Sequence, residues 1–308
     1  MSSSAREPTP ITILNLPRWI VRTARSDRRR YRGSGRPMSA RRLWRLLRPN
    51  LRRAVFIVGA DRSGTTFLGD SLAAVPELSY HHEPVLTKAA GRYVYERRWS
   101  ERRAVLLYRT TYAWLLRIHA DGDLRLAEKT PSNSFILPFL ARTFPDSRFV
   151  HIVRDGRDAV ASHLKQPWLL AGSLATGRRE PTGYRYGPDA RFWVEKHRRA
   201  EFESTSDLAR TIWSWRRHTE AALEGRTLGR TRYHELRYEE LVNRPAEAGE
   251  RLLDFLGIHT PASRAALLEA LTVAESRSVG RWHDELGAEQ LAEVEKEAGE
   301  LLRELGYA

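Results

Sequence analysis

Short apolar runs alternate with amphipathic segments along most of the chain. Four short segments have the pattern of strands, and two of them, AVFIV and RFVHIV, consist mainly of apolar residues, as buried parallel strands do. The four predicted strands cover residues 54–58, 124–129, 148–153 and 231–238. The segments between them repeat their apolar residues at helical spacing. Strands that alternate with helices predict an α/β fold, with a parallel sheet flanked by helices on both faces.

The first 53 residues differ sharply in charge from the rest. They contain fifteen arginines against Glu7 and Asp27, which gives them a net charge of +13 out of +14 for the whole chain. A basic arm of this kind favours contact with an anionic polymer or membrane surface, or serves only to keep the protein in solution. We therefore divide the chain into a basic N-terminal arm, 1–53, which is partly flexible, and one α/β domain, 54–308.

Two parts of the arm carry separate expectations. Residues 25–37 are rich in arginine and glycine and are expected to be flexible. Residues 41–53 can form a short amphipathic helix with Leu43, Leu46 and Leu47 on one face, which would dock on the domain or touch a membrane. No stretch approaches the ~20 apolar residues of a transmembrane helix, and no signal peptide is evident. We expect a cytoplasmic protein that can be peripheral to a membrane.

The loop after the first predicted strand reads GADRSGTTFL and begins at Gly59. Gly59 and Gly64 have the spacing of a phosphate-binding P-loop, and the strand before the loop and the helix after it are the context that such a loop requires. Thr65 replaces the lysine of that motif, while a cation, Arg62, lies within the loop. We expect the backbone amides and the hydroxyls of Thr65 and Thr66 to bind a short anionic group.

A second motif follows the predicted strand 148–153. Arg154 stands at the carboxyl end of this strand, where open α/β sheets bind their ligands. A P-loop NTPase would need a magnesium-binding carboxylate at such a strand end, and Arg154 stands in its place. Ser162 follows eight residues later in the next helix, so a guanidinium and a hydroxyl can hold a second phosphate. An NTP-dependent kinase with a variant P-loop is the alternative.

Together the two motifs resemble those of the sulfotransferases that use 3′-phosphoadenosine 5′-phosphosulfate (PAPS). GADRSGTTFL resembles their 5′-phosphosulfate loop, and RFVHIVRDGRDAVASHL resembles their 3′-phosphate motif. The resemblance covers roughly residues 54–306 and is nearest to the glycan and tyrosylprotein branch. It implies the sulfotransferase fold, PAPS as co-substrate without a metal, and transfer of a sulfuryl group to the hydroxyl of a glycan or another alcohol.

The resemblance also implies which residues bind the nucleotide. They are Arg62, Ser63, Gly64, Thr65, Thr66 and Phe67 in the first loop, Arg154 and Ser162 at the 3′-phosphate, Tyr238 near the adenine, and Arg277, Gly280, Arg281 and Trp282 in a loop that closes over the 3′-phosphate. Phe67 departs from the tryptophan of cytosolic members. Arg277 and Arg281 do not align cleanly with the basic pair of the family.

The catalytic residues implied by the resemblance are Glu83, Lys129 and Arg62. Glu83 lies 21 residues after Arg62, which is the spacing of the glutamate base in the tyrosylprotein branch, and His81 or His82 is the alternative base. Lys129, in EKTPS, corresponds to the lysine that contacts the transferring sulfuryl group. A carboxylate base that works near neutral pH needs a pKa raised by burial.

The acceptor site is expected in the loop 165–190 and the helices after it, because function varies in loops on a fixed scaffold. Trp213 and Trp215 are expected mainly to pack, with acceptor contact as the alternative. The chain has no cysteine, and its histidines show no metal-ligand spacing, so no metal site is expected. A third hypothesis is a protein whose basic arm binds nucleic acid; the nearly neutral domain argues against it, and we expect no sequence-specific nucleic-acid partner.

Overall fold

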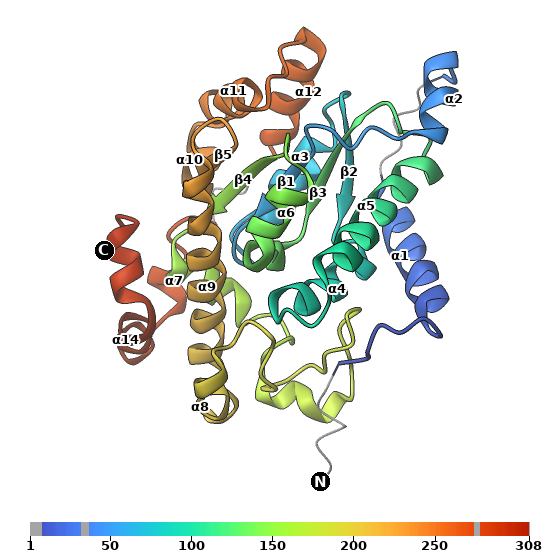
Figure 1. Cartoon of the computed structure of the whole chain (residues 1–308). Helices are drawn as coiled ribbons and strands as arrows, with labels where there is room; N and C mark the ends of the chain where they lie inside the picture. Colours follow the sequence, from blue (N-terminus) through green and yellow to red (C-terminus); the bar gives the residue numbers. More distant parts are fainter. Residues whose placement is uncertain (1–7, 32–36, 274–277, 308) are drawn as a thin grey trace.

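The centre of the computed structural model is a five-stranded parallel sheet with the strand order β2-β3-β1-β4-β5 (Figure 1). The structure describes residues 8–31, 37–273 and 278–307. The strands are β1 (Val55–Val58), β2 (Leu78–His82), β3 (Arg125–Lys129), β4 (Arg148–Val153) and β5 (Tyr233–Arg237). The predicted α/β class with a parallel sheet is confirmed.

Strand β2 is the one strand of this sheet that the sequence pattern did not predict. Its sequence, LSYHH, contains a serine and two histidines and lacks the apolar run of a buried strand. β2 lies at the edge of the sheet, where it pairs with β3 and places His82 opposite Lys129. The strand is buried all the same, because helix α1 of the arm packs against it. Its two histidines have partners in that helix, Asp27 for His81 and Arg30 for His82.

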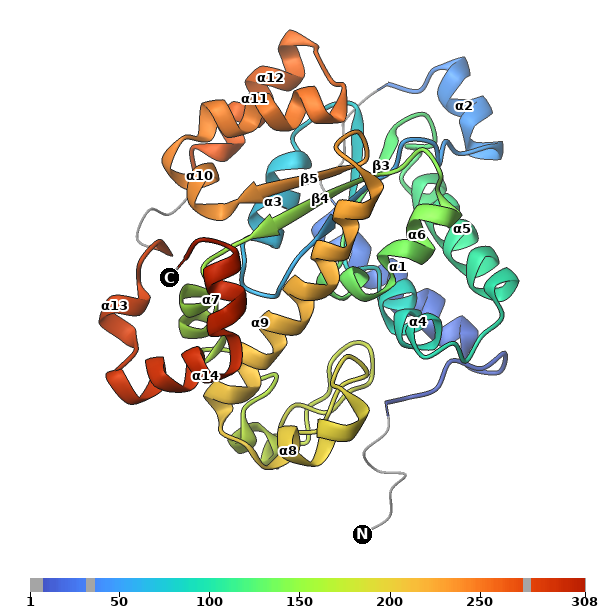
Figure 2. The same cartoon turned by 60° about the vertical axis from the view of Figure 1, so that its left-hand side comes forward.

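Helices cover both faces of the sheet and its carboxyl edge (Figures 1 and 2). The helices are α1 (Leu16–Arg30), α2 (Ala40–Leu47), α3 (Thr65–Leu72), α4 (Val85–Tyr95), α5 (Glu101–Ile118), α6 (Leu137–Thr143), α7 (Gly156–His163), α8 (Arg199–Ser204), α9 (Asp207–Leu223), α10 (Tyr238–Asn243), α11 (Pro245–Leu256), α12 (Pro261–Leu271), α13 (Trp282–Glu285) and α14 (Ala288–Glu304), with 3₁₀ turns η2 (Pro131–Ile136), η3 (Ala171–Thr176), η4 (Lys196–Arg198) and η5 (Glu224–Leu228). Two helices, α8 and α9, follow the loop 165–190. Ser206 caps α9 by accepting a hydrogen bond from the amide of Ala209 at 2.9 Å, and this cap separates α9 from α8.

The side chains of β1 show how the two faces are filled. Val55 and Ile57 belong to the core formed with α3, α11 and α12, while Phe56 and Val58 belong to the core formed with α4, α5 and α6. All four are fully buried, as expected for a central parallel strand. A third core joins α7, α9 and α14 beyond the end of β4. This packing fixes the strand ends that carry the two predicted motifs.

Helix α1 of the arm is part of the packed structure and not a free extension. Trp19 is 2% exposed, and the hydroxyl of Thr23 accepts a hydrogen bond from the amide of Leu86 at 3.0 Å. The helix runs to Arg30, so the flexibility expected over 25–37 is wrong for residues 25–31. The physical reason is Asp27, a buried carboxylate with histidine partners on the domain, which the arginine-rich composition did not reveal.

Helix α2 docks on the domain by a polar contact. The guanidinium of Arg42 donates two hydrogen bonds to the carbonyl of Ala120, at 3.1 and 3.0 Å. Leu43 and Leu47, expected on the docking face, are 60% and 69% exposed. No helix within the described residues is long and apolar enough to cross a membrane.

Candidate active site

The loop after β1 makes a tight turn that two of its residues can adopt only as glycine. Gly59 has φ of +137°, and a Cβ there would lie 2.4 Å from the carbonyl oxygen of Ile152 on β4. Gly64 has φ of +90°, and a Cβ there would lie 2.3 Å from the ring of Tyr238. Gly64 caps α3, whose first amides have no acceptor within the helix. The hydroxyl of Ser63 is buried without a partner among the described residues. Donors therefore gather at this turn, as an anion site requires.

Three residues predicted from separate motifs meet at this loop. Arg62 donates from Nε to the hydroxyl of Ser162 at 3.0 Å, and Arg154 donates to the carbonyl of Arg62 at 2.9 Å. The Arg154 guanidinium also lies over the ring of Tyr238, 4.6 Å from its centroid. Arg62 has φ of +67°, a strained value for a residue with a side chain. This backbone conformation turns the Arg62 side chain toward Ser162 on α7. The loop after β1 and the loop after β4 therefore lie in contact.

The segment 278–282 closes this site from the other side. Asp158 accepts hydrogen bonds from the amides of Gly280 and Trp282, at 2.8 and 3.1 Å. Arg154 donates to the carbonyl of Ser278, whose hydroxyl is 2.6 Å from that of Tyr238. Asp158 and Ser278 thus position the closing loop, a role that the sequence did not show for either residue.

Three further residues predicted to bind the nucleotide are Phe67, Arg281 and Arg277. Phe67 is half-buried and meets the Tyr238 ring edge to face at 6.5 Å, so both rings lie beside the loop. Arg281 pairs with Glu285 at 3.0 Å, as expected of a surface pair on one helical turn. Arg277 lies outside the described residues.

Glu83 follows β2 directly and lies between two lysines. Its carboxylate accepts from Lys129 at 2.5 Å and from Lys88 at 2.6 Å, and its amide donates to the carbonyl of Lys129 at 2.9 Å. Glu83 has φ of +46°, which turns the chain from β2 into α4. Lys88 is not among the residues predicted from the sequence. A signal was present, because the chain has only five lysines, and the scarcity that singled out Lys129 applies equally to Lys88.

The charge state of this cluster differs from the expectation for a base. Burial would raise the pKa of Glu83, but Lys129 and Lys88 hold it well below its usual range. This is opposite to the raised pKa that a carboxylate base near neutral pH was expected to need. Burial and the nearby Lys129 lower the pKa of His82 to about 3, so His82 is a neutral neighbour 3.7 Å from Glu83. His81 is fully buried against Asp27, away from the cavity, and does not fit the role of base.

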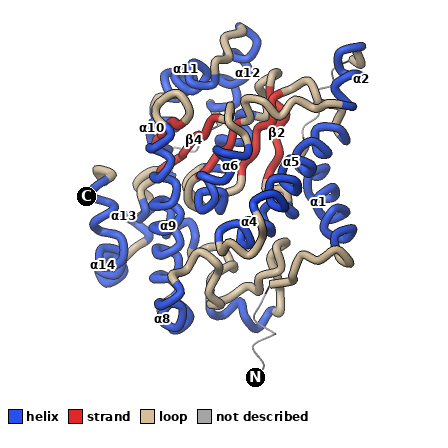
Figure 3. The backbone as a smooth tube through the Cα atoms, viewed as in Figure 1, coloured by secondary structure: helices blue, strands red, loops and turns tan. Residues whose placement is uncertain are grey.

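A cavity of about 510 Å³ extends from Glu83 and Lys129 to the loop between α7 and α8. This loop, drawn in tan at the end of the molecule near the N-terminus in Figure 3, contributes aromatic side chains to the wall. They include Trp168, Tyr184, Tyr186 and Trp193. The arm contributes Ser26 and Arg30 from α1. Trp213 and Trp215 are buried elsewhere, where their indole N–H groups bond Glu195 and the carbonyl of Arg154.

Two anion-binding places at neighbouring strand ends suit a nucleotide that carries phosphate groups on both sides of its ribose. This arrangement is typical of the class of nucleotide-dependent group transferases with a P-loop-like fold. The family comparison makes this specific. Residues 54–262 match the model described as the sulfotransferase family, and the chain belongs to that family. The NTP-dependent kinase is accordingly not favoured.

Curated relatives of the chain come from bacteria and animals. Nodulation protein NoeE of Sinorhizobium fredii is 26% identical over 294 residues, which cover 82% of this chain and 65% of that protein. Protein-tyrosine sulfotransferase 1 of Danio rerio and of Homo sapiens are each 30% identical over 131 residues, 38% of this chain. The matched region makes up 37% and 35% of those two proteins, so the chain spans about a third of their length.

Solved structures share the fold at low sequence identity. The sulfotransferase domain from the curacin biosynthetic pathway has a TM-score of 0.53 at 17% identity, covering 82% of this chain and 98% of that domain. Sulfotransferase STF9 from Mycobacterium avium has a TM-score of 0.50 at 16% identity, covering 86% of this chain and 79% of that protein. Similarity at this level concerns the fold alone.

Proposed function

We propose that this protein transfers a sulfuryl group from PAPS to an acceptor hydroxyl. The observation that carries the proposal is the position of Arg62, which touches Ser162 through its side chain and Arg154 through its carbonyl. Two predicted phosphate sites, about 90 residues apart in the sequence, thereby become one continuous site. A nucleotide with a 5′-phosphosulfate and a 3′-phosphate needs both sites at once.

In this proposal each of the two loops binds a different part of PAPS, the sulfuryl donor. The turn from Ser63 to Thr66 holds the 5′-phosphosulfate with backbone amides and hydroxyls. Arg154 and Ser162 hold the 3′-phosphate, because a guanidinium fork and a hydroxyl donate the charge-assisted hydrogen bonds that a phosphate accepts. Phe67 and Tyr238 flank the adenine, and the residues around Gly280 close over the nucleotide. No step of this scheme calls for a metal.

The chemistry is proposed to run through Glu83 and Lys129. The acceptor oxygen attacks sulfur and loses its proton to Glu83, and the bond from sulfur to the 5′-phosphate oxygen breaks. Lys129 and Arg62 stabilise the negative charge that develops on the bridging oxygen as adenosine 3′,5′-bisphosphate leaves. When Lys129 turns from Glu83 toward the sulfuryl group, Glu83 loses one of its two cations, and its pKa rises. The base then gains strength only when the donor is in place.

The cavity wall suggests the class of acceptor. Aromatic rings from Trp168 and Tyr184 provide flat apolar surfaces, and Thr182 and Glu180 provide hydrogen-bonding groups beside them. Such a mixture suits the alternating apolar faces and hydroxyl edges of a sugar. We therefore propose a glycan or a comparable alcohol as the acceptor. Arg30 makes the arm a part of this acceptor wall.

Calorimetric titration tests the donor assignment. The purified full chain is titrated with adenosine 3′,5′-bisphosphate and, separately, with ATP plus magnesium. We expect binding of the bisphosphate at one equivalent and little response to ATP. Magnesium-dependent ATP binding without a response to the bisphosphate would contradict the proposal. Transfer of ³⁵S from labelled PAPS to a panel of saccharides, phenols and peptides then identifies the acceptor.

For the arm, we propose that α2 touches an anionic membrane on the cytoplasmic side. Leu43, Trp44 and Leu47 are exposed together, and Arg41 in the helix and Arg48 directly after it are also exposed. Apolar side chains beside arginines are the pattern of an interfacial helix. The full chain should sediment with phosphatidylglycerol vesicles and not with phosphatidylcholine vesicles. The double variant Leu43→Ser/Leu47→Ser should remain in solution; if it sediments as the wild type does, α2 is not the contact.

A further inference from the structure

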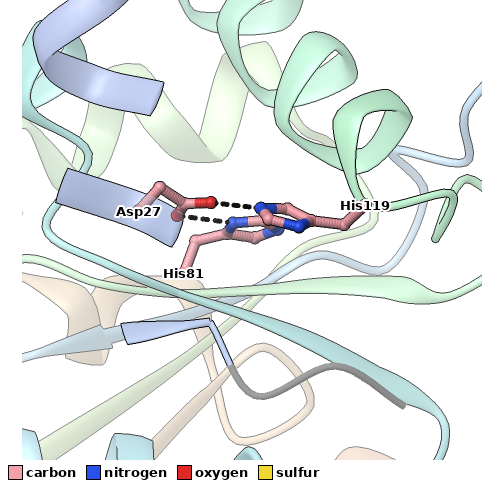
Figure 4. Close-up of side chains that lie close together, drawn as sticks. All are labelled: Asp27, His81 and His119. Atoms are coloured by element: carbon pink, nitrogen blue, oxygen red, sulfur yellow. Dashed lines mark hydrogen bonds and ion pairs between the residues drawn. The ribbon is translucent and has the colours of Figure 1, made fainter. Parts of the chain in front are cut away.

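A buried polar cluster joins the arm to the domain outside the cavity, and the proposed reaction does not use it. The carboxylate of Asp27 on α1 contacts both His81 of β2 and His119, which ends α5 (Figure 4). One carboxylate oxygen is 2.9 Å from His81 Nδ1 and the other is 2.6 Å from His119 Nε2. The side chains are 1%, 0% and 8% exposed for Asp27, His81 and His119. Tyr31 covers the cluster, with its ring stacked on His119 at 3.5 Å.

The hydrogen bonds around His81 make its Nε2 a donor and leave Nδ1 facing a carboxylate. Ser79 has one hydroxyl proton, and its oxygen lies 3.0 Å from Asp121 and 3.1 Å from His81 Nε2. Since the carboxylate of Asp121 can only accept, Ser79 donates to it, and His81 must donate from Nε2 to Ser79. His81 Nδ1 faces the carboxylate of Asp27 at 2.9 Å, out of water. A positive charge between these two atoms stabilises the buried contact, and either a proton or a metal ion can supply it.

We infer that Asp27, His81 and His119 form a binding site for a divalent transition-metal ion such as Zn²⁺. The ligand atoms of the three residues lie within 4.8 Å of one another, and imidazole nitrogens with a carboxylate are ligands that zinc prefers. Bound at 2.0–2.2 Å, such ligands lie about 3.3 Å apart around a tetrahedral ion, so the contacts of 2.9 and 2.6 Å would lengthen by about 0.4 and 0.7 Å. Ser79 and Asp121 orient His81 from behind, as second-shell partners of metal-bound histidines do.

The position of the site indicates what the ion does. The three ligands come from α1, β2 and the end of α5, so the ion ties the arm to the domain. The cavity wall does not include its ligands. However, α1 also supplies Ser26 and Arg30 to the acceptor wall, and β2 leads into Glu83. The ion is therefore structural, and it holds an acceptor-binding element in place.

Metal titration of the untagged full chain tests this inference. The chain is first treated with a chelator and desalted, and then titrated with Zn²⁺ by calorimetry and with Co²⁺ by visible absorption. We expect one equivalent of either ion, a cobalt spectrum of low-symmetry nitrogen and oxygen ligation, and a higher thermal midpoint with Zn²⁺ present. Asp27→Asn and His119→Gln should each bind Zn²⁺ at least tenfold more weakly. His259→Ala, at an exposed histidine, is the matched control and should bind as the wild type does.

Two results would overturn the inference. If the wild type takes up no Zn²⁺ or Co²⁺ at one equivalent, a proton on His81 Nδ1 fills the place between the two side chains. If Asp27→Asn keeps the wild-type affinity, the ion binds elsewhere. The wild-type titration decides the first case even when a variant fails to fold, and circular dichroism identifies such a variant. Neither result depends on sulfuryl transfer, so the proposed function is tested separately.

Discussion

Replacement of Arg154 by alanine is the sharpest test of the donor site. In the structure this guanidinium is buried, it donates to the carbonyls of Arg62 and Ser278, and it lies over Tyr238. In the proposed complex it also holds the 3′-phosphate. A hydrogen bond between charged partners contributes about 1.5–3 kcal/mol. Arg154→Ala should therefore weaken the binding of adenosine 3′,5′-bisphosphate by about 10- to 150-fold.

The structure also provides a way to separate binding from loop support. Arg154→Ala leaves two carbonyls without their donor, and this disturbance of the loops would weaken the binding of any adenine nucleotide. Calorimetry is therefore run with both the bisphosphate and adenosine 5′-phosphate, which lacks the 3′-phosphate. The wild type should strongly prefer the bisphosphate, and Arg154→Ala should lose most of that preference. Arg154→Lys keeps the charge without the fork and should retain an intermediate preference.

A matched control is available three residues away. Arg157 is a partly buried cation on the same turn, but it pairs with Asp155 at 2.7 Å and lies over Trp282. Arg157→Ala should change the preference for the bisphosphate less than threefold, a discrimination of under about 0.7 kcal/mol. If Arg154→Ala weakens both nucleotides by the same factor, Arg154 only supports the loops, and the assignment of the 3′-phosphate site is refuted.

Three further predictions follow from the charges around Glu83 and β3. Glu83→Gln should lower turnover by about 10²- to 10⁴-fold while the Kd of the bisphosphate stays within twofold; normal turnover would remove Glu83 as the base. Lys88→Met should move the acidic limb of the kcat profile to higher pH, because one of the two cations that depress the pKa of Glu83 is gone, whereas Lys165→Met, at a surface pair with Glu285, should leave the profile in place. Burial raises the pKa of Glu128 to about 8, so between its ordinary value of 4.5 and 8 the folded state holds a proton that the unfolded state has released. The free energy of unfolding should thus fall with rising pH by up to about 1.4 kcal/mol per unit from this group, and urea denaturation of Glu128→Gln at pH 6, 7 and 8 should show a smaller fall; equal slopes would contradict the raised pKa.

Local sequence was sufficient for the features that depend on neighbours along the chain. The strand before Gly59, the turn itself and the helix after Gly64 occupy one continuous stretch. The residue types of each segment favour the structure that the segment adopts. The same holds for the strand that ends before Arg154 and the helix that contains Ser162. Since a parallel sheet places the carboxyl ends of its strands at one edge, the predicted fold class put both motifs at the same edge. Their direct contact depends on the pairing of β1 with β4, which the structure decided.

Only the tertiary structure decided which residues interact electrostatically and which residues line the same cavity wall. Asp27 and His81 are 54 positions apart, and their contact turns a polar segment into a buried strand and an arginine-rich one into a docked helix. Lys88, near the start of α4, reaches the Glu83 carboxylate because Glu83, with φ of +46°, turns the chain from β2 into α4. Periodicity reports which face of an element is apolar, but a buried polar side chain is stable only through a specific partner. The sequence does not name that partner, so the electrostatics of the site and the place of the arm required the folded chain.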